Sequence, residues 1–259
     1  MRGNIFYIRM ENVSHMVLSY GITIRDFMSA LSFFPPNILL INKVDSTREI
    51  DINTGFNMIL GAENVQAYLL SKQTKNQKWI DFDDIRDLEY ITPREVSELL
   101  YLGHAYTNLQ SPFYYKLQNN FIFLTLPNGA LKVYYRRLDV FYSIFVQAVT
   151  KKILEVYRER KPILSLRLHV EPLEKKIGEQ LAVLFAEGLV LDFSRLYIAN
   201  KKIQLPLLIA SDNTYNVKWH EPLLLTEHSK LVGNLVYIIE KRKWEIEMLK
   251  PQAFDGQTL

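Results

Sequence analysis

The spacing of apolar and polar positions predicts a chain that mixes helices and strands. Its clearest helix begins at Thr92, because Thr92 and Glu95 can exchange capping hydrogen bonds and Pro93 suits the first helical position. Apolar residues at three- and four-residue spacing predict further helices. These follow the cap at Thr23, lie around 65–69, and extend over 139–161 and about 172–188.

Short β-prone runs lie between these helices. The turn pairs Asn119-Asn120 and Asn128-Gly129 separate three apolar runs, at 113–118, 121–126 and 130–136, which predicts an antiparallel meander. Further strands are expected at 4–10, 38–41, 79–82, 189–193, 197–198 and 203–209. Proline cannot donate to a ladder, so Pro206 predicts that 203–209 is an edge strand. The runs 235–239 and 244–249 fit a closing hairpin or a helix, and the alternation of the second favours a strand.

The predicted fold class is therefore α+β, an antiparallel or mixed sheet with a central meander at about 113–136, packed by several helices. A boundary near Pro162 divides a main α+β domain, 1–161, from a smaller α+β module, 162–250, with a tail at 251–259. One compact unit is the alternative. The pattern I-T-x-R-acid-apolar occurs at 22–27 and again at 91–96, which fits either a duplicated unit or two independent helix starts.

Composition narrows the class of protein. The chain has 259 residues, 48% of them hydrophobic, which is ample for a packed core. The net charge of +3 is small, so charge alone does not indicate a nucleic-acid or membrane surface. The absence of cysteine excludes disulfides and thiolate sites, and a cytoplasmic location is the simplest expectation. No secretory signal is visible, and no run approaches the roughly 20 apolar residues that a membrane span requires.

The sequence contains no signature of a cofactor or metal site. None of the five histidines pairs with another at metal-ligand spacing, and a loose cluster at His220-Glu221 and Glu227-His228 fits surface histidines better than ligands. No nucleophile elbow, phosphate-binding glycine loop or dinucleotide fingerprint occurs. We therefore expect no cofactor and no metal.

Two alternatives to a protein that binds a protein partner or a small ligand arise from particular clusters: an enzyme and a nucleic-acid-binding protein. Carboxylates gather from Asp81 to Asp87 and could bind Mg²⁺ or act as acid and base, although a solvated loop explains them more simply. Tyrosines interleave with bases at 114–116 and 134–137, and on one sheet face they could stack single-stranded nucleic acid. Aromatic pairs across neighbouring strands also stabilise ordinary sheets. The chain is not strongly basic and has no RRM or OB motif, so nucleic acid is disfavoured as a partner.

The segment 101–137 is the first place to expect a ligand. His104 follows a predicted helix and can titrate near neutrality, so an enzyme would use His104 or the Asp81–Asp87 carboxylates. The catalytic residues of such an enzyme are otherwise unspecified. The candidate ligand-facing residues are His104, Tyr106, Tyr114, Tyr134 and Arg136.

Three segments carry a resemblance to a known family. They are NIFYIRMENVSHMVLSYGITIRDF at 4–27, ELLYLGH at 98–104 and SPFYYKL at 111–117. The chain resembles a family of uncharacterised proteins of Gram-positive bacteria, some of which are labelled as an oxalate:formate antiporter. That label conflicts with the absence of spanning segments. The resemblance implies a bacterial cytoplasmic origin and supplies no catalytic residues.

These observations favour a noncatalytic cytoplasmic protein that binds a protein partner or a small ligand. They leave its oligomeric state open.

Overall fold

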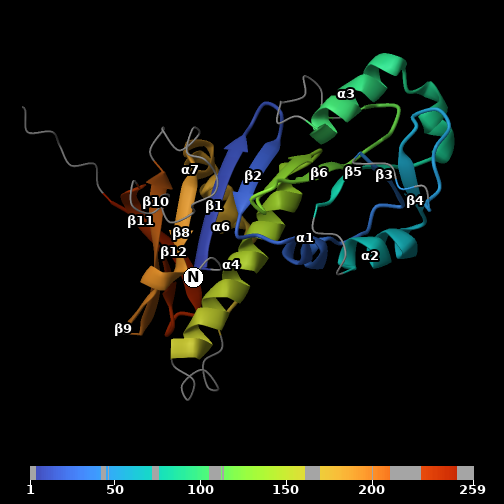
Figure 1. Cartoon of the computed structure of the whole chain (residues 1–259). Coiled ribbons are helices and arrows are strands. Elements are labelled where there is room, and N and C mark those ends of the chain that lie inside the picture. Colours follow the sequence, from blue (N-terminus) through green and yellow to red (C-terminus); the bar gives the residue numbers. More distant parts are fainter. Residues whose placement is uncertain are drawn as a thin grey trace, which may run out of the picture.

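The computed structural model describes residues 4–41, 45, 47–71, 76–104, 112, 114–160, 170–199, 201–210 and 229–249, with the side chains of 103 and 104 outside the description. Figure 1 shows the arrangement of its elements. In chain order these are β1 (Ile5–Glu11), β2 (Met16–Tyr20), α1 (Ile24–Ala30), β3 (Asn37–Leu40), β4 (Asn57–Leu60), α2 (Ala62–Leu70), β5 (Lys78–Phe82), the 3-10 helix η2 (Ile85–Tyr90), α3 (Pro93–His104), β6 (Phe121–Thr125), β7 (Leu131–Tyr135), α4 (Leu138–Arg160), α6 (Lys175–Gln180), α7 (Ala182–Glu187), β8 (Leu189–Asp192), the 3-10 helix η3 (Phe193–Arg195), β9 (Tyr197–Ala199), β10 (Lys202–Ala210), β11 (Ser229–Ile238) and β12 (Lys243–Met248).

The fold is α+β, as the sequence predicts, and its strands form one antiparallel sheet. The strand order is β12-β11-β10-β8-β1-β2-β7-β6-β5-β3-β4, and β9 also pairs with β10. The N-terminal hairpin β1-β2 lies inside the sheet, because β1 pairs with β8 and β2 pairs with β7. Strands from both sides of the predicted boundary near Pro162 therefore belong to the same sheet, while the division of the chain into two domains stays a prediction.

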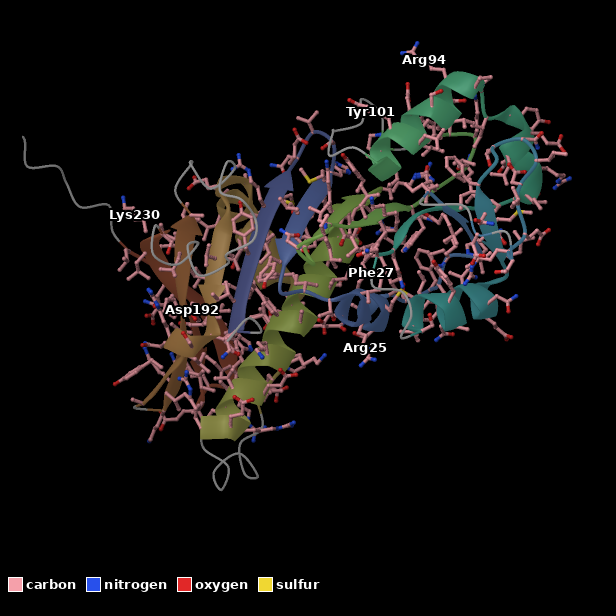
Figure 2. The ribbon with its side chains drawn as sticks, viewed as in Figure 1. Arg25, Phe27, Arg94, Tyr101, Asp192 and Lys230 are labelled. Atoms are coloured by element: carbon pink, nitrogen blue, oxygen red, sulfur yellow. The ribbon has the colours of Figure 1, made fainter. Side chains whose placement is uncertain are left out.

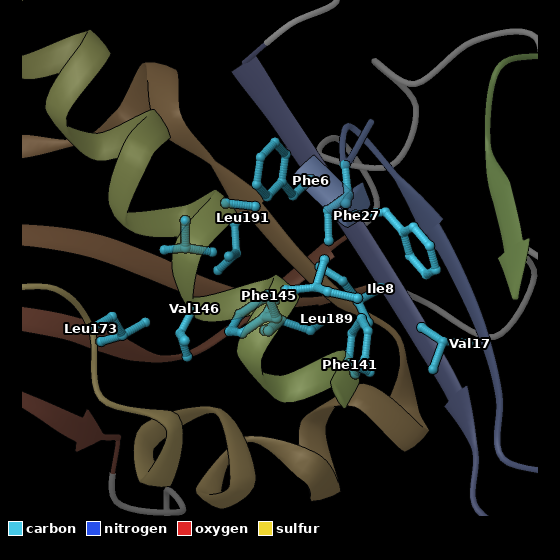
Figure 3. Close-up of a cluster of buried hydrophobic side chains, with 14 of the residues drawn as sticks. Phe6, Ile8, Val17, Phe27, Phe141, Phe145, Val146, Leu173, Leu189 and Leu191 are labelled. Atoms are coloured by element: carbon cyan, nitrogen blue, oxygen red, sulfur yellow. The ribbon is translucent and has the colours of Figure 1, made fainter. Parts of the chain in front are cut away.

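Both faces of the sheet are covered, so its central strands bury alternate side chains on opposite sides. In β1, Phe6 and Ile8 belong to one core while Ile5 and Tyr7 belong to the other. Helix α4, which its 23 residues make about 35 Å long, crosses the first face (Figure 1). Figure 3 shows how side chains of β1, β2, β8, α1 and α4 meet in that core. They include Phe6, Ile8, Val17, Phe27, Phe141, Phe145, Val146, Leu189 and Leu191.

The two predicted helix caps are confirmed. Thr92 and Glu95 exchange hydrogen bonds at the start of α3, with 2.7 Å between Thr92 N and Glu95 Oε2. Thr23 caps α1 in the same way. The two helices pack on opposite faces, because Phe27 of α1 lies in the first core and Leu99 of α3 lies in the second. The shared pattern at 22–27 and 91–96 thus corresponds to two capping boxes.

The predicted meander is correct in two of its three strands. β6 and β7 pair across the turn at Asn128-Gly129, but the predicted strand 113–118 is wrong, because residues 115–118 form a turn. Within it Leu117 N donates to Tyr114 O, and Asn119 Oδ1 accepts from Tyr114 N. These bonds use the backbone groups that a ladder would need. On the side away from β7, β6 pairs with β5 instead of with this segment.

The expectation that Pro206 marks an edge strand is also wrong. β10 pairs with β11 on one side and with both β8 and β9 on the other. Its residues 202–204 face β9 and 207–209 face β8. Pro206 lies in the interval between these two pairings, so a residue without an N–H is accommodated inside the sheet. The last two strands form the hairpin that their alternation predicts.

Candidate functional site

A cleft of about 340 Å³ lies where the start of α1 faces the middle of α4. Its volume falls in the range of small-molecule sites. β1 supplies Phe6, and the segment that joins β2 to α1 supplies Gly21 and Thr23. The complete lining is Phe6, Gly21, Thr23, Arg25, Asp26, Ala148, Lys151, Lys152 and Glu155.

Gly21 lets the segment before α1 pass close to β1 and so shapes one wall of the cleft. Its φ is +91°, a conformation that other residues adopt only with strain. A Cβ at this position would lie 2.4 Å from both Ile5 O and Phe6 Cδ1. No side chain fits there. The backbone turns at Gly21 against β1, and the capping box at Thr23 begins α1 two residues later.

Asp26 and Lys151 join the two walls of the cleft. The Thr23 N–H and hydroxyl donate to Asp26 Oδ2, at 3.0 and 2.7 Å, while Lys151 Nζ lies 2.8 Å from Oδ1. The Asp26 side chain is 10% exposed and that of Lys151 is 61% exposed. The Asp26 carboxylate is therefore held through one oxygen by the helix cap at Thr23. Its other oxygen accepts from the Lys151 ammonium group, which is still exposed to solvent.

These contacts keep both groups charged. Burial acts to raise the pKa of Asp26, but hydrogen bonds from Lys151 and Thr23 outweigh burial, so this pKa lies below its ordinary value. The hydrogen bond to Asp26 raises the pKa of Lys151. Neither group is therefore prepared to exchange a proton near neutral pH.

Of the remaining charged side chains of the lining, two pair with each other and one has no ion-pair partner among the described residues. Lys152 Nζ lies 3.3 Å from Glu155 Oε2 on the same helix. Arg25 is exposed on the first turn of α1, and it forms no ion pair with any residue that the structure describes. Figure 2 shows its side chain extending outward from α1. The cleft thus has three cations against two carboxylates, and both carboxylates already have a lysine partner.

Of the residues predicted to face a ligand, Tyr114, Tyr134 and Arg136 are outside the lining of the cleft. His104 ends α3 and its side chain is outside the description, as is the whole of Tyr106. Tyr114 is buried, and its hydroxyl donates to Glu98 Oε2 at 3.2 Å. Burial and the neighbouring Glu98 raise the pKa of Tyr114. Tyr134 is fully buried in the second core. The Arg136 guanidinium donates to the carbonyl of Gln118 at 2.9 Å.

The acidic run 81–87 separates into residues with distinct structural roles. Asp81 is buried and accepts from the backbone N–H groups of Asn120 and Phe121, where β6 begins. Burial raises its pKa to about 6, against the effect of these hydrogen bonds. Asp84 caps η2 and pairs with Arg86. Among the described side chains, no three histidines or carboxylates come close enough together to hold a metal ion.

The tyrosines at 134 and 135 do not form an exposed stacking surface. Tyr134 belongs to the core beneath α3, and Tyr135 belongs to the core beneath α4. Tyr135 is 3% exposed and contacts the rings of Phe27 and Phe121. Both rings stabilise the sheet, so neither can receive a nucleic-acid base.

The cleft itself was not predicted from the sequence. The capping box at Thr23 and the run Lys151-Lys152 within an otherwise apolar helical pattern were the signals present. Nothing in the sequence links Asp26 to a lysine 125 residues away. Their meeting depends on the packing of α1 against α4.

Known proteins give this chain no family assignment. No protein-family model, no curated protein and no solved structure matches it. Within the part of the chain that the structure describes, no helix is long and apolar enough to span a membrane. The functional conclusion therefore depends on the chemistry of the cleft.

Proposed function

We propose that this chain is a noncatalytic cytoplasmic protein that binds a small ligand in the cleft between α1 and α4. The observation that carries the proposal is the Asp26–Lys151 contact, which joins the two walls of a concave site through charges of fixed sign. The absence of cysteine from the sequence supports a reducing compartment.

The charge states of the lining support binding over catalysis. A general acid or base works best with a pKa near the operating pH. The pKa of Asp26 is lowered and that of Lys151 is raised, so both move away from neutrality. The lining also contains no histidine or cysteine. The enzyme alternative receives no support from Asp81, whose carboxylate is buried and holds the start of β6.

The shape of the site supports a small ligand over a protein partner. Phe6 and Ala148, each 3% exposed, form a small apolar floor, and charged side chains surround them. Small-molecule sites typically combine an apolar lining with a few polar groups that fix the orientation of the ligand. A volume of about 340 Å³ suits a small organic molecule.

Ligand-observed NMR with a fragment set containing acids, amines, alcohols and sugars tests this proposal. Ala148→Leu extends the floor into the cleft, and Glu155→Trp places a large ring at its half-exposed rim. Ala62→Leu is the control, because Ala62 is an exposed alanine at the start of α2, outside the lining. We expect fragments that bind the wild type and Ala62→Leu, and that lose binding in both cleft variants.

Glu155→Trp keeps the test valid if Ala148→Leu does not fold, since Glu155 is on the surface of α4. A fragment set without hits overturns the proposal. So does a set whose hits bind Glu155→Trp and the wild type equally well.

A further inference from the structure

We infer that the ligand of this cleft carries an oxyanion, a carboxylate or a phosphate, on an apolar body, and that Arg25 is its main contact. The inference rests on the proposed function, since it names the chemical class of ligand for the same site. This inference is based on which charged side chains of the lining already have an ion-pair partner within the protein and which do not.

Each carboxylate of the cleft already has a lysine partner. Asp26 accepts from Thr23 through one oxygen and from Lys151 through the other. Glu155 accepts from Lys152. A cationic ligand would therefore have to compete with lysines already in place, and it would also face the positive charge of Arg25.

The cations, in contrast, keep donors for a ligand. Lys151 uses one hydrogen bond on Asp26, and its side chain is 61% exposed. A protonated lysine has three donors, so two remain. Arg25 has five donors in a planar fork, and none of them bonds to a described residue. Such a fork matches the two oxygens of a carboxylate or phosphate.

The position of Arg25 is not explained by the stability of its helix. It lies in the first turn of the seven-residue helix α1 and forms no ion pair with a described residue there. It also lies close enough to Lys151 for the two like charges to repel, an effect that acts to lower the pKa of Lys151. An anion between Arg25 and Lys151 would relieve this repulsion.

The floor of the cleft determines the rest of the ligand. Phe6 is 3% exposed, and its ring packs edge-on against Phe193 with 4.8 Å between centroids. Its position is therefore set by the core, and with Ala148, which is also 3% exposed, it forms a small apolar floor. The ligand places its apolar body on this floor and its oxyanion at the rim beside Arg25.

Four probes of similar size separate the alternatives: phenylacetate, phenyl phosphate, 2-phenylethanol and 2-phenylethylamine. Their affinities are measured by NMR titration at pH 7, with inorganic phosphate alone as a fifth titrant. We expect both acids to bind more tightly than the alcohol and the amine. Tighter binding of phenyl phosphate than of inorganic phosphate shows that the apolar body contributes, and the order of the two acids shows which oxyanion fits.

The variants assign this preference to the cleft. Arg25→Gln should weaken binding of the better acid by about fivefold to tenfold and leave the alcohol unchanged, because a partly exposed charged hydrogen bond is lost. Arg158→Gln is the control. Arg158 is exposed on the same helix as Lys151, about 10 Å further along it, and lies outside the lining.

The outcomes separate this inference from the proposed function. If the alcohol or amine binds at least as tightly as the acids, and Glu155→Trp abolishes that binding, the oxyanion inference fails while the cleft stands as a ligand site. Equal losses in Arg25→Gln and Arg158→Gln also overturn the inference, since they indicate general attraction between charges. If all probes and the fragment set fail to bind, both conclusions fall.

Discussion

Lys151 Nζ lies 2.8 Å from Asp26 Oδ1, and this contact links the first turn of α1 to the middle of α4 across 125 residues of sequence. The two partners differ in environment, since the carboxylate is nearly buried and the ammonium group is largely exposed. Removing the lysine leaves a buried carboxylate with only its helix-cap donors. Removing the carboxylate leaves a solvated lysine. The contact should therefore respond unequally to substitution of its two ends.

Lys151→Met should lower the free energy of unfolding at pH 7 by about 1 kcal/mol, the upper end for a pair that is partly exposed. The pKa of Asp26 is lowered on folding, so its stabilising contribution is complete above its unfolded pKa and is lost as pH falls through the folded value. Urea denaturation at pH 7 and pH 3 should therefore show a smaller pH effect in this variant. Lys176→Met, an exposed lysine on α6, is the control. Identical losses at both pH values in Lys151→Met would exclude a role for Asp26.

Thr23→Ala and Thr92→Ala remove equivalent caps from different surroundings. Loss of a threonine cap costs about 1 kcal/mol. Thr23 also donates its hydroxyl to the buried Asp26, whereas the Thr92 box is exposed. We expect Thr23→Ala to lower stability more than Thr92→Ala, by about another 1 kcal/mol. Chemical denaturation of both variants measures the difference, and equal losses would show that Asp26 does not need the hydroxyl.

Asp81 should give stability a pH dependence of the opposite sign. Its pKa is raised to about 6 by burial, so the folded state binds a proton more tightly than the unfolded chain. Its contribution is favourable below the ordinary value of 3.8 and is lost as pH rises through about 6. The slope is at most about 1.4 kcal/mol per pH unit.

Denaturation between pH 4 and pH 7 checks this expectation. Asp81→Asn cannot titrate, so the slope attributed to Asp81 should disappear from this variant. Asp83→Asn, an exposed neighbour in the same acidic run, should keep the slope of the wild type. A slope that survives in Asp81→Asn belongs to another group.

Gly129→Ala introduces backbone strain alone, whereas Gly21→Ala introduces backbone strain and a steric clash. Both glycines have positive φ, +91° and +84°, which costs an alanine about 1–2 kcal/mol. A Cβ at Gly129 meets nothing within 4 Å, while one at Gly21 meets Ile5 O at 2.4 Å. We expect Gly21→Ala to be clearly the more destabilising substitution in thermal unfolding and to weaken ligand binding in the cleft. Equal melting temperatures would mean that the backbone near Gly21 adjusts at little cost.

Local interactions explain which elements could be predicted from the sequence. Capping boxes at Thr23 and Thr92 depend on residues three apart, so their patterns identify the starts of α1 and α3 directly. The apolar spacing that predicts a helix over 139–161 corresponds to α4, and the turn at Asn128-Gly129 places β6 beside β7. The α+β class follows from these elements.

Contacts between distant residues decided the rest. Which strands pair decides that β1 lies beside β8 and that Pro206 lies inside the sheet. Pairing between strands that are distant in sequence leaves no local sequence pattern. The run 113–118 has strand-like composition, yet side-chain and backbone bonds at Tyr114 and Asn119 hold residues 115–118 in a turn. Tyr134, expected to face a ligand, lies in a core because both faces of the sheet are covered.

The sequence by itself determined where helices begin, how apolar faces repeat and that no cysteine chemistry is present. Only the tertiary structure brought Arg25, Asp26 and Lys151 to one cleft. The physical reason is range: a cap joins atoms within one helical turn, while the cleft requires α1 and α4 to pack on the same face of a twelve-stranded sheet.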